Sequence, residues 1–91
     1  MASVDVVFRD RYGLHPRSAM RIQQAVAGFK SKVTIASIES NGRPADAASM
    51  IALVSMGIRN GEKIRITAAG PDEDAAVEAL GLLVENGVCH K

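Results

Sequence analysis

The stretch Lys63-Ile64-Arg65-Ile66-Thr67 alternates charged or polar side chains with isoleucines. Successive side chains of a strand point to opposite faces of a sheet, so this pattern predicts a strand with one buried face and one wet face. Sheets with one solvated face are commonly antiparallel and pack their other face on the core. The stretch therefore fits a sheet that is solvated on one face, as in an α+β open-faced sandwich, and the strands and helices expected around it imply that fold, with all helices on the other face of the sheet.

Turn and helix signals follow and precede this strand. Asn60-Gly61 before it and Gly70-Pro71 after it predict turns. The segment Pro71-Asp72-Glu73-Asp74 then places three carboxylates where a helix dipole favours negative charge, and it predicts a helix that ends at Gly87. The apolar positions of this helix are Ala76, Leu80, Leu83 and Val84.

The N-terminal part predicts a strand, a helix and a second strand. Val4 to Arg9 is rich in β-branched residues and predicts a strand that ends near Asp10. A helix is expected from Pro16 until Gly28 and Lys30-Ser31 end the run, and residues 32–38 predict the next strand. The apolar positions of this helix are Ala19, Ile22, Ala25 or Val26, and Phe29.

The middle of the chain completes the order βαββαβα. Asn41-Gly42 predicts a hairpin turn, and Arg43 to Ala45 predicts a short strand that Pro44 places towards a sheet edge. Ser49 to Met56 predicts a helix of two turns that opens with a capping residue and stops at Gly57. We expect a four-stranded, mainly antiparallel sheet with three helices on one face.

Size and composition narrow the possible functions. The 91 residues leave room for a single domain over 1–88 with a tail over 89–91, and no second catalytic domain fits. A net charge of +1 and scattered aromatic residues argue against nucleic-acid binding. Neither a signal peptide nor a membrane span is indicated. The lone Cys89 suits a reducing, cytoplasmic compartment, and Cys89-His90 is a poor metal pair, so no metal site is expected.

The stretch Gly13-Leu14-His15-Pro16-Arg17-Ser18-Ala19 places an imidazole where a loop turns into a helix. Proline is favoured at the first helical position, which makes His15 the N-cap or its neighbour. An anion attached to His15 would then lie against unpaired backbone N–H groups at the positive end of the helix dipole. Arg17 adds a planar fork of donors suited to phosphate oxygens. The stretch indicates an imidazole that takes up a phosphoryl group and passes it on.

The chain resembles the HPr family, the histidine-containing phosphocarriers of the bacterial phosphoenolpyruvate-dependent sugar phosphotransferase system. The resemblance implies a carrier rather than an enzyme, in which enzyme I phosphorylates His15 at Nδ1 and the carrier donates the group to a sugar-specific enzyme IIA. It assigns Arg17 as the phosphate partner and implies no cofactor in the chain. The shared residues span nearly the whole chain: Gly13-Leu14-His15 with Arg17, Asn41-Gly42, Ser49-Met50-Ile51, Ser55-Met56-Gly57, and Gly61 before Ile64 and Ile66.

Two linked positions depart from the family's usual Gly-Leu-His-Ala-Arg-Pro. Pro16 replaces a small residue, and Ser18 stands where the family has its proline. Pro16 removes an N–H that could face a phosphate, whereas Ser18 restores an N–H and adds a hydroxyl one residue later. We therefore expect a shifted anion site that includes Ser18.

Members of the family differ in duty, and the sequence leaves two alternatives open. The stretches Ile51-Ala52-Leu53 and Ala69 to Glu73 look like the nitrogen-related branch, and His15 sets aside the catabolite-repression homologue that lacks the histidine. The chain could also be a regulatory module whose phosphorylated or unphosphorylated form binds other proteins without sugar transport. Ser49 is expected to cap its helix, and in some bacteria the equivalent serine is phosphorylated by an HPr kinase/phosphorylase.

A docking surface is expected beside His15. The short helix is apolar on too many sides to be buried all round, so two of Met50, Ile51, Val54 and Met56 are expected to pack inwards. Methionines suit a surface that fits several partners in turn, and the basic rim suits acidic partner faces. We expect a monomer. The predicted partner-binding residues are Met20, Arg21, Gln24, Met50, Ile51 and Val54.

Overall fold

The computed structural model describes residues 1–39 and 43–87. In this part of the chain four strands and three helices follow one another in the predicted order βαββαβα. The strands pair antiparallel throughout, in the sheet order β1-β4-β2-β3. The elements are β1 (Ala2–Val7), α1 (Pro16–Val26), β2 (Lys32–Ser37), β3 (Ala45–Asp46), α2 (Met50–Ser55), β4 (Lys63–Ala69) and α3 (Glu73–Glu85).

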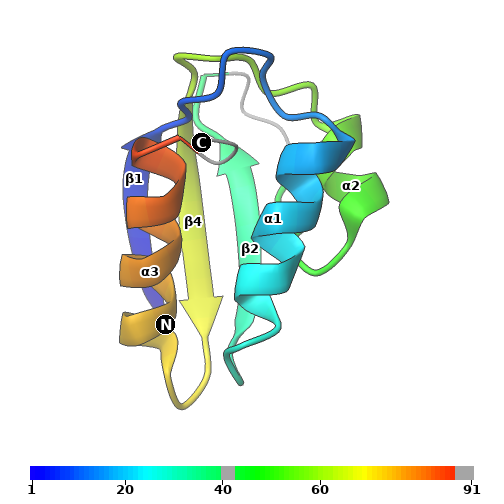
Figure 1. Cartoon of the computed structure of the whole chain (residues 1–91). Coiled ribbons are helices and arrows are strands. Elements are labelled where there is room, and N and C mark those ends of the chain that lie inside the picture. The colour runs from blue at the N-terminus through cyan, green and yellow to red at the C-terminus, as the bar shows by residue number, and fades with distance from the viewer. Residues whose placement is uncertain (40–42, 88–91) are drawn as a thin grey trace.

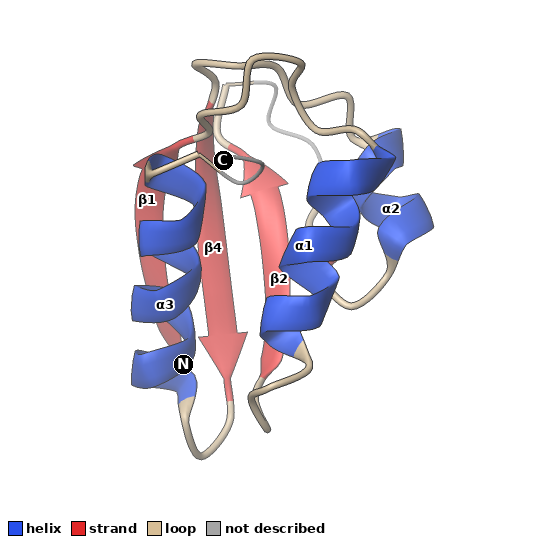
Figure 2. Cartoon of the chain, viewed as in Figure 1, coloured by secondary structure: helices blue, strands red, loops and turns tan. Residues whose placement is uncertain are grey.

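Helices α1 and α3 lie side by side over one face of the sheet, and α2 lies beside α1 (Figure 1). The other face carries no helix in the described residues, as Figure 2 shows by colour. On that face Arg65 of β4 donates two hydrogen bonds to Asp5 of β1, at 2.7 and 3.0 Å. The open-faced sandwich expected from the sequence is therefore confirmed. No helix within 1–39 and 43–87 is long and apolar enough to cross a membrane.

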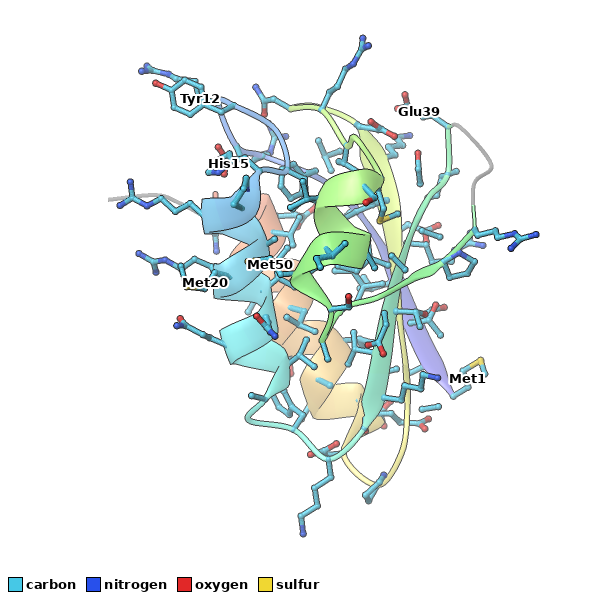
Figure 3. The ribbon with its side chains drawn as sticks, turned by 90° about the vertical axis from the view of Figure 1, so that its right-hand side faces the viewer. Met1, Tyr12, His15, Met20, Glu39 and Met50 are labelled. Atoms are coloured by element: carbon cyan, nitrogen blue, oxygen red, sulfur yellow. The ribbon has the colours of Figure 1, made fainter. Side chains whose placement is uncertain are left out.

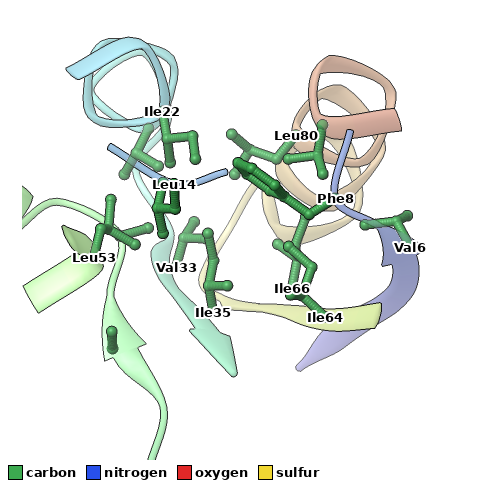
Figure 4. Packing of buried hydrophobic residues seen from close by; sticks show 14 of the residues in the cluster. Val6, Phe8, Leu14, Ile22, Val33, Ile35, Leu53, Ile64, Ile66 and Leu80 are labelled. Carbon is green, nitrogen blue, oxygen red and sulfur yellow. The ribbon is translucent and has the colours of Figure 1, made fainter. Parts of the chain in front are cut away.

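The alternating isoleucines of β4 face the helices, as their spacing predicts. Ile64 and Ile66 are fully buried, whereas Arg65 between them is exposed. They pack in one cluster with Phe8 and with Leu80 of α3 (Figure 4). Burying a side chain of this size stabilises a fold by about 1.5–3 kcal/mol, so each of these residues helps to hold the helices on the sheet.

Strand β1 and helix α1 differ in extent from the prediction, and β2 ends one residue earlier than expected, at Ser37. Strand β1 covers Ala2–Val7 instead of Val4 to Arg9, because Ala2 already pairs with Ala68 and the chain leaves the sheet after Val7. Helix α1 ends at Val26, before the expected Phe29, because the following residues form tighter turns of the backbone.

The third strand is also displaced from its predicted position. It covers Ala45–Asp46 instead of Arg43 to Ala45, and among the described strands it pairs with β2 alone, at the sheet edge. Pro44 has no N–H to donate to a strand ladder, which is consistent with a start just after it. The predicted turn at Asn41-Gly42 and the predicted tail over 89–91 lie outside the described residues.

Candidate functional site

The loop before α1 is fastened to a second loop, which precedes β4. Leu14 N–H donates to the Ile58 carbonyl at 2.8 Å, and Gly61 N–H donates to the Phe8 carbonyl at 2.7 Å. A side chain adds to this contact, because Asp10 N–H donates to Oδ1 of Asn60 at 3.0 Å. The two loops together fix the position at which α1 begins.

Gly13 allows the two loops to approach closely. Its φ is +75°, and a Cβ placed there would lie 2.7 Å from the Ile58 carbonyl oxygen. Glycine adopts this backbone region without the strain that a side chain would add. Gly13 thus serves the close approach of the two loops, and it affects His15, two residues later, only through the position of this loop.

His15 is the N-cap of α1, as predicted. Its Nδ1 accepts a hydrogen bond from the Arg17 N–H at 3.2 Å, and Pro16 occupies the first helical position. The backbone N–H of His15 in turn donates to Oγ of Ser18 at 2.9 Å, which completes a capping box. Because Nδ1 accepts here, its lone pair points at the N-terminus of the helix.

Ser18 is fully buried, and its hydroxyl lies beneath the first turn of α1. The hydroxyl accepts from the His15 N–H at 2.9 Å, and its own proton faces two carbonyl oxygens, that of His15 at 3.0 Å and that of Gly13 at 3.4 Å. This geometry differs from the role expected for the hydroxyl, because its three contacts all go to backbone groups of Gly13 and His15 and none is directed at solvent. Ser18 thus holds His15 in place.

Arg17 is exposed in the first turn of α1. Within the described part of the chain its guanidinium makes no hydrogen bond or ion pair, and the first turn contains no acidic residue. An uncompensated cation at the positive end of a helix is unfavourable by a few tenths of a kcal/mol to about 1 kcal/mol. A bound anion would remove this cost.

Most of the predicted partner-binding residues are exposed. Met20 of α1 and Met50 of α2 lie on the same side of the molecule, below His15 and Tyr12 (Figure 3). Their exposed fractions are 46% and 38%, and that of Ile51 is 78%. The remaining members are Arg21 and Gln24, which are exposed, and Val54, which packs partly against the core together with Met56.

The two helices that carry this surface are joined by a residue that the sequence analysis missed. Nε2 of Gln23 donates to the Ala48 carbonyl at 2.9 Å and so ties α1 to the segment before α2. Ser49 then caps α2 as expected, since its Oγ accepts from the Ala52 N–H at 3.3 Å. Phosphorylation of Ser49 remains a prediction.

Asp10 and Tyr12 belong to the site but were not predicted to do so. Asp10 is buried, and its Oδ2 lies 3.5 Å from Nε2 of His15. The Tyr12 ring meets the imidazole edge-on, with 6.1 Å between the ring centroids. An aspartate two residues before an N–H that it can accept from, in a loop ahead of a glycine, is the pattern of an Asx turn and could have indicated Asp10.

Within residues 1–39 and 43–87 no three possible metal ligands lie together. The predicted poor pair, Cys89-His90, lies outside these residues. What the site offers is an imidazole nitrogen and a backbone N–H at the start of α1, with the exposed side chain of Arg17 in the same helical turn. This arrangement suits a covalently attached anion.

The chain is similar to several known proteins. Residues 2–86 match the family model described as PTS HPr component phosphorylation site. The phosphocarrier protein NPr of Proteus mirabilis is 38% identical over 82 residues, which cover 90% of this chain and 89% of that protein. The crystal structure of HPr-C-His from Thermoanaerobacter tengcongensis superimposes with a TM-score of 0.85 at 28% identity, covering 94% of this chain and 93% of that one.

Some relatives are much longer than this chain. The multiphosphoryl transfer protein of Salmonella typhimurium is 30% identical over 86 residues, which cover 94% of this chain. The chain spans only 23% of the length of that relative. The match therefore concerns one segment of the longer protein.

Proposed function

The chain belongs to the HPr family of the phosphotransferase system, whose members are phosphocarriers, and on this premise we propose that it accepts a phosphoryl group on Nδ1 of His15. One observation carries the proposal. Nδ1 accepts from the Arg17 N–H at 3.2 Å, so its lone pair already points to where a phosphoryl group would meet the N-terminus of α1. The donor in this proposal is phosphorylated enzyme I, and the acceptor is an enzyme IIA.

The transfer needs no acid or base from this chain. The lone pair of Nδ1 attacks phosphorus, and the bond between phosphorus and the donor breaks with its electron pair returning to the donor. The phosphoryl oxygens then accept from the Arg17 N–H and from its guanidinium, in place of Nδ1. The reverse sequence delivers the group to the next protein, so His15 is a relay and the chain is consumed and regenerated once per transfer.

Partner docking is proposed over Met20, Met50 and Ile51. Met20 and Met50 lie on the same side of the molecule as His15 (Figure 3), Ile51 is exposed next to Met50 in α2, and the exposed Arg17 and Arg21 add positive charge on α1. Such a surface suits acidic partner faces and rapid, weak encounters. The chain is proposed to act as a monomer in them.

The nitrogen-related duty is the second candidate. The NPr relative from Proteus mirabilis matches over 89% of its own length, which supports a free-standing carrier of that kind as well as one for sugar. A panel of purified IIA proteins from sugar and nitrogen branches separates the two. Transfer to a sugar IIA supports uptake, transfer only to a nitrogen-related IIA supports the second candidate, and transfer to neither favours a regulatory module.

The test of the acceptor uses enzyme I, Mg²⁺ and phosphoenolpyruvate, with intact mass measured at alkaline pH. We expect the mass of one phosphoryl group on the parent chain and none on His15→Ala. His90→Ala is the matched control, because His15 and His90 are the 2 histidines of the chain. Labelling that survives His15→Ala, or that is lost in His90→Ala, would overturn the proposal.

A further inference from the structure

Two buried polar atoms face each other behind the imidazole of His15. Asp10 Oδ2 lies 3.5 Å from His15 Nε2. Both atoms are shielded from solvent, and neither makes a hydrogen bond within the described residues. Burying a carboxylate oxygen without compensation is costly, so each atom is the other's available partner. The proposed carrier function makes no use of this pair.

The carboxylate of Asp10 is held in its orientation from both sides. Its other oxygen, Oδ1, accepts from the Tyr12 N–H at 3.1 Å. Its backbone N–H donates to Oδ1 of Asn60 at 3.0 Å, which ties it to the loop before β4. With these contacts made, Oδ2 is the oxygen that remains to face the imidazole.

The other side of the imidazole determines where its proton sits. A neutral imidazole carries one N–H, and its second nitrogen is an acceptor. Since Nδ1 accepts from the Arg17 N–H, Nε2 carries the proton and points it at the carboxylate. A carboxylate facing the protonated nitrogen favours this tautomer over the one with the proton on Nδ1.

We propose that Asp10 is a positioning residue that keeps the proton of His15 on Nε2 and so leaves the lone pair of Nδ1 free for phosphorus. The inference rests on the proposed function only in taking Nδ1 as the acceptor. Asn60 and the Tyr12 N–H act through Asp10, because they set the direction of its Oδ2.

Asp10 also has a role once phosphate is attached. When the bond from Nδ1 to phosphorus forms, the donor's bond to phosphorus breaks and Nε2 keeps its proton. The ring then carries a positive charge, and Asp10 Oδ2 faces a cation instead of a neutral N–H. Attraction between opposite charges is strong where water is excluded, so this separation shortens in the phosphorylated protein.

The direct test is the tautomer of His15, read from the imidazole ¹⁵N chemical shifts at alkaline pH, where the ring is neutral. The parent is expected to hold its proton on Nε2. Asp10→Asn keeps an oxygen for the Tyr12 N–H and turns an NH₂ group towards Nε2, so the Nδ1–H tautomer should become more populated. Asp5→Asn, which removes a carboxylate from the far face of the sheet, should leave the tautomer unchanged.

A second variant covers the case in which Asp10→Asn does not fold. The hydroxyl of Asp10→Ser can still accept from the Tyr12 N–H but is too short to reach Nε2, so the preference for Nε2–H should weaken. An unchanged tautomer in a folded Asp10 variant would overturn the proposal. This measurement needs no partner protein, so it stands even if His15 is never phosphorylated.

Kinetics supply the second readout. The rate at which enzyme I phosphorylates Asp10→Asn should fall by about 10- to 100-fold. This is the range found when a metal-binding histidine loses the carboxylate that orients its other ring nitrogen. The KM for the carrier should stay unchanged, because Asp10 is buried and does not belong to the docking surface. Parent-like turnover with a shifted tautomer, or a raised KM alone, would overturn the assignment.

Discussion

Helices α1 and α3 begin in opposite ways, although each has a polar side chain at its N-cap. His15 turns Nδ1 towards its own helix and accepts from the Arg17 N–H. Asp72 makes no capping bond to its own helix, and its carboxylate accepts instead from the N–H groups of Lys30 and Ser31 and from the Ser31 hydroxyl. The His15 side chain therefore bonds to its own helix, whereas the Asp72 side chain bonds to a neighbouring loop.

The charged residues in the first turns of the two helices also differ. The first turn of α3 contains two acids, and one of them, Glu73, also binds the N-terminal ammonium at 2.7 Å. The first turn of α1 contains no acid, and Arg17 stands there. Negative charge already compensates the positive end of α3, while that of α1 is left for an anion that comes from outside. A helix start becomes an anion site where the chain leaves its charge uncompensated.

Removing the cation from the first turn of α1 should have the largest effect on phosphoryl transfer. Arg17→Ala is expected to slow transfer from enzyme I by about 100-fold, the scale of losing one donor to a developing oxyanion. Thermal stability should be unchanged or slightly higher, because Arg17 is exposed and its charge opposes the helix dipole. The control is Arg65→Ala on the open face of the sheet. Equal rates for Arg17→Ala and the parent would contradict a role for the guanidinium.

Disturbing the loop before α1 should have the next largest effect. Gly13→Ala places a Cβ 2.7 Å from the Ile58 carbonyl at a φ of +75°. The expected cost is about 1–3 kcal/mol of unfolding free energy, together with a fall in transfer rate of about 10-fold as His15 is displaced. Chemical denaturation and a transfer assay at matched folded fraction measure the two. Gly28→Ala, where the nearest atom to an added Cβ is 3.5 Å away, is the control.

The exchange of proline and serine around Arg17 tests how α1 is capped. Ser18→Ala removes the acceptor of the His15 N–H and should cost about 1 kcal/mol, with a modest fall in transfer. The double change Pro16→Ala with Ser18→Pro restores the family's usual motif. Its transfer rate should be higher than the rate expected from adding the separate effects of Pro16→Ala and Ser18→Pro. The four proteins compared are the parent, Pro16→Ala, Ser18→Pro and the double variant. If the effects of the two single changes on the transfer rate simply add in the double variant, the two positions do not share one site.

Changing the α3 start should alter stability and leave transfer untouched. The Ser31 hydroxyl, followed by the Lys30 N–H, holds the pKa of Asp72 below its usual value. Its carboxylate therefore stabilises the fold above the unfolded-state pKa of about 3.9, and this contribution is lost as the pH falls through the lower folded-state pKa.

Asp72→Asn should accordingly lower the Tm at neutral pH and narrow the difference in Tm between neutral and acidic solution. Transfer by the folded variant should match the parent. A slower transfer would contradict the division of roles between the two helix starts, and a parent-like dependence of Tm on pH would contradict the role of Asp72.

Sequence alone predicted the elements that local patterns determine. Alternation in β4, the Pro16 start of α1 and the Ser49 cap of α2 each depend on residues close together in the chain, and the structure agrees with them. The same local signals placed His15 at a helix start beside an uncompensated arginine. They also gave the correct order of the elements.

Contacts between distant residues could not be predicted in this way. Asp10 meets Asn60 across 50 positions, and Asp72 meets Ser31 across 41, so neither pattern is visible within one segment. The direction of the Ser18 hydroxyl was missed for another reason. A capping box turns the third helical side chain back to the N-cap, and this competes with an outward contact to an anion.

The position of the phosphorus atom tests the account most directly. In the phosphorylated protein, labelled with ¹⁵N, coupling between ³¹P and ¹⁵N should appear at Nδ1 of His15, and the Arg17 amide proton should shift downfield as it passes from Nδ1 to a phosphoryl oxygen. Phosphorus on Nε2 would contradict the account, since Nε2 faces Asp10 and lies away from the start of α1. Phosphorus on Nδ1 with an unmoved Arg17 amide would contradict the proposed anion site.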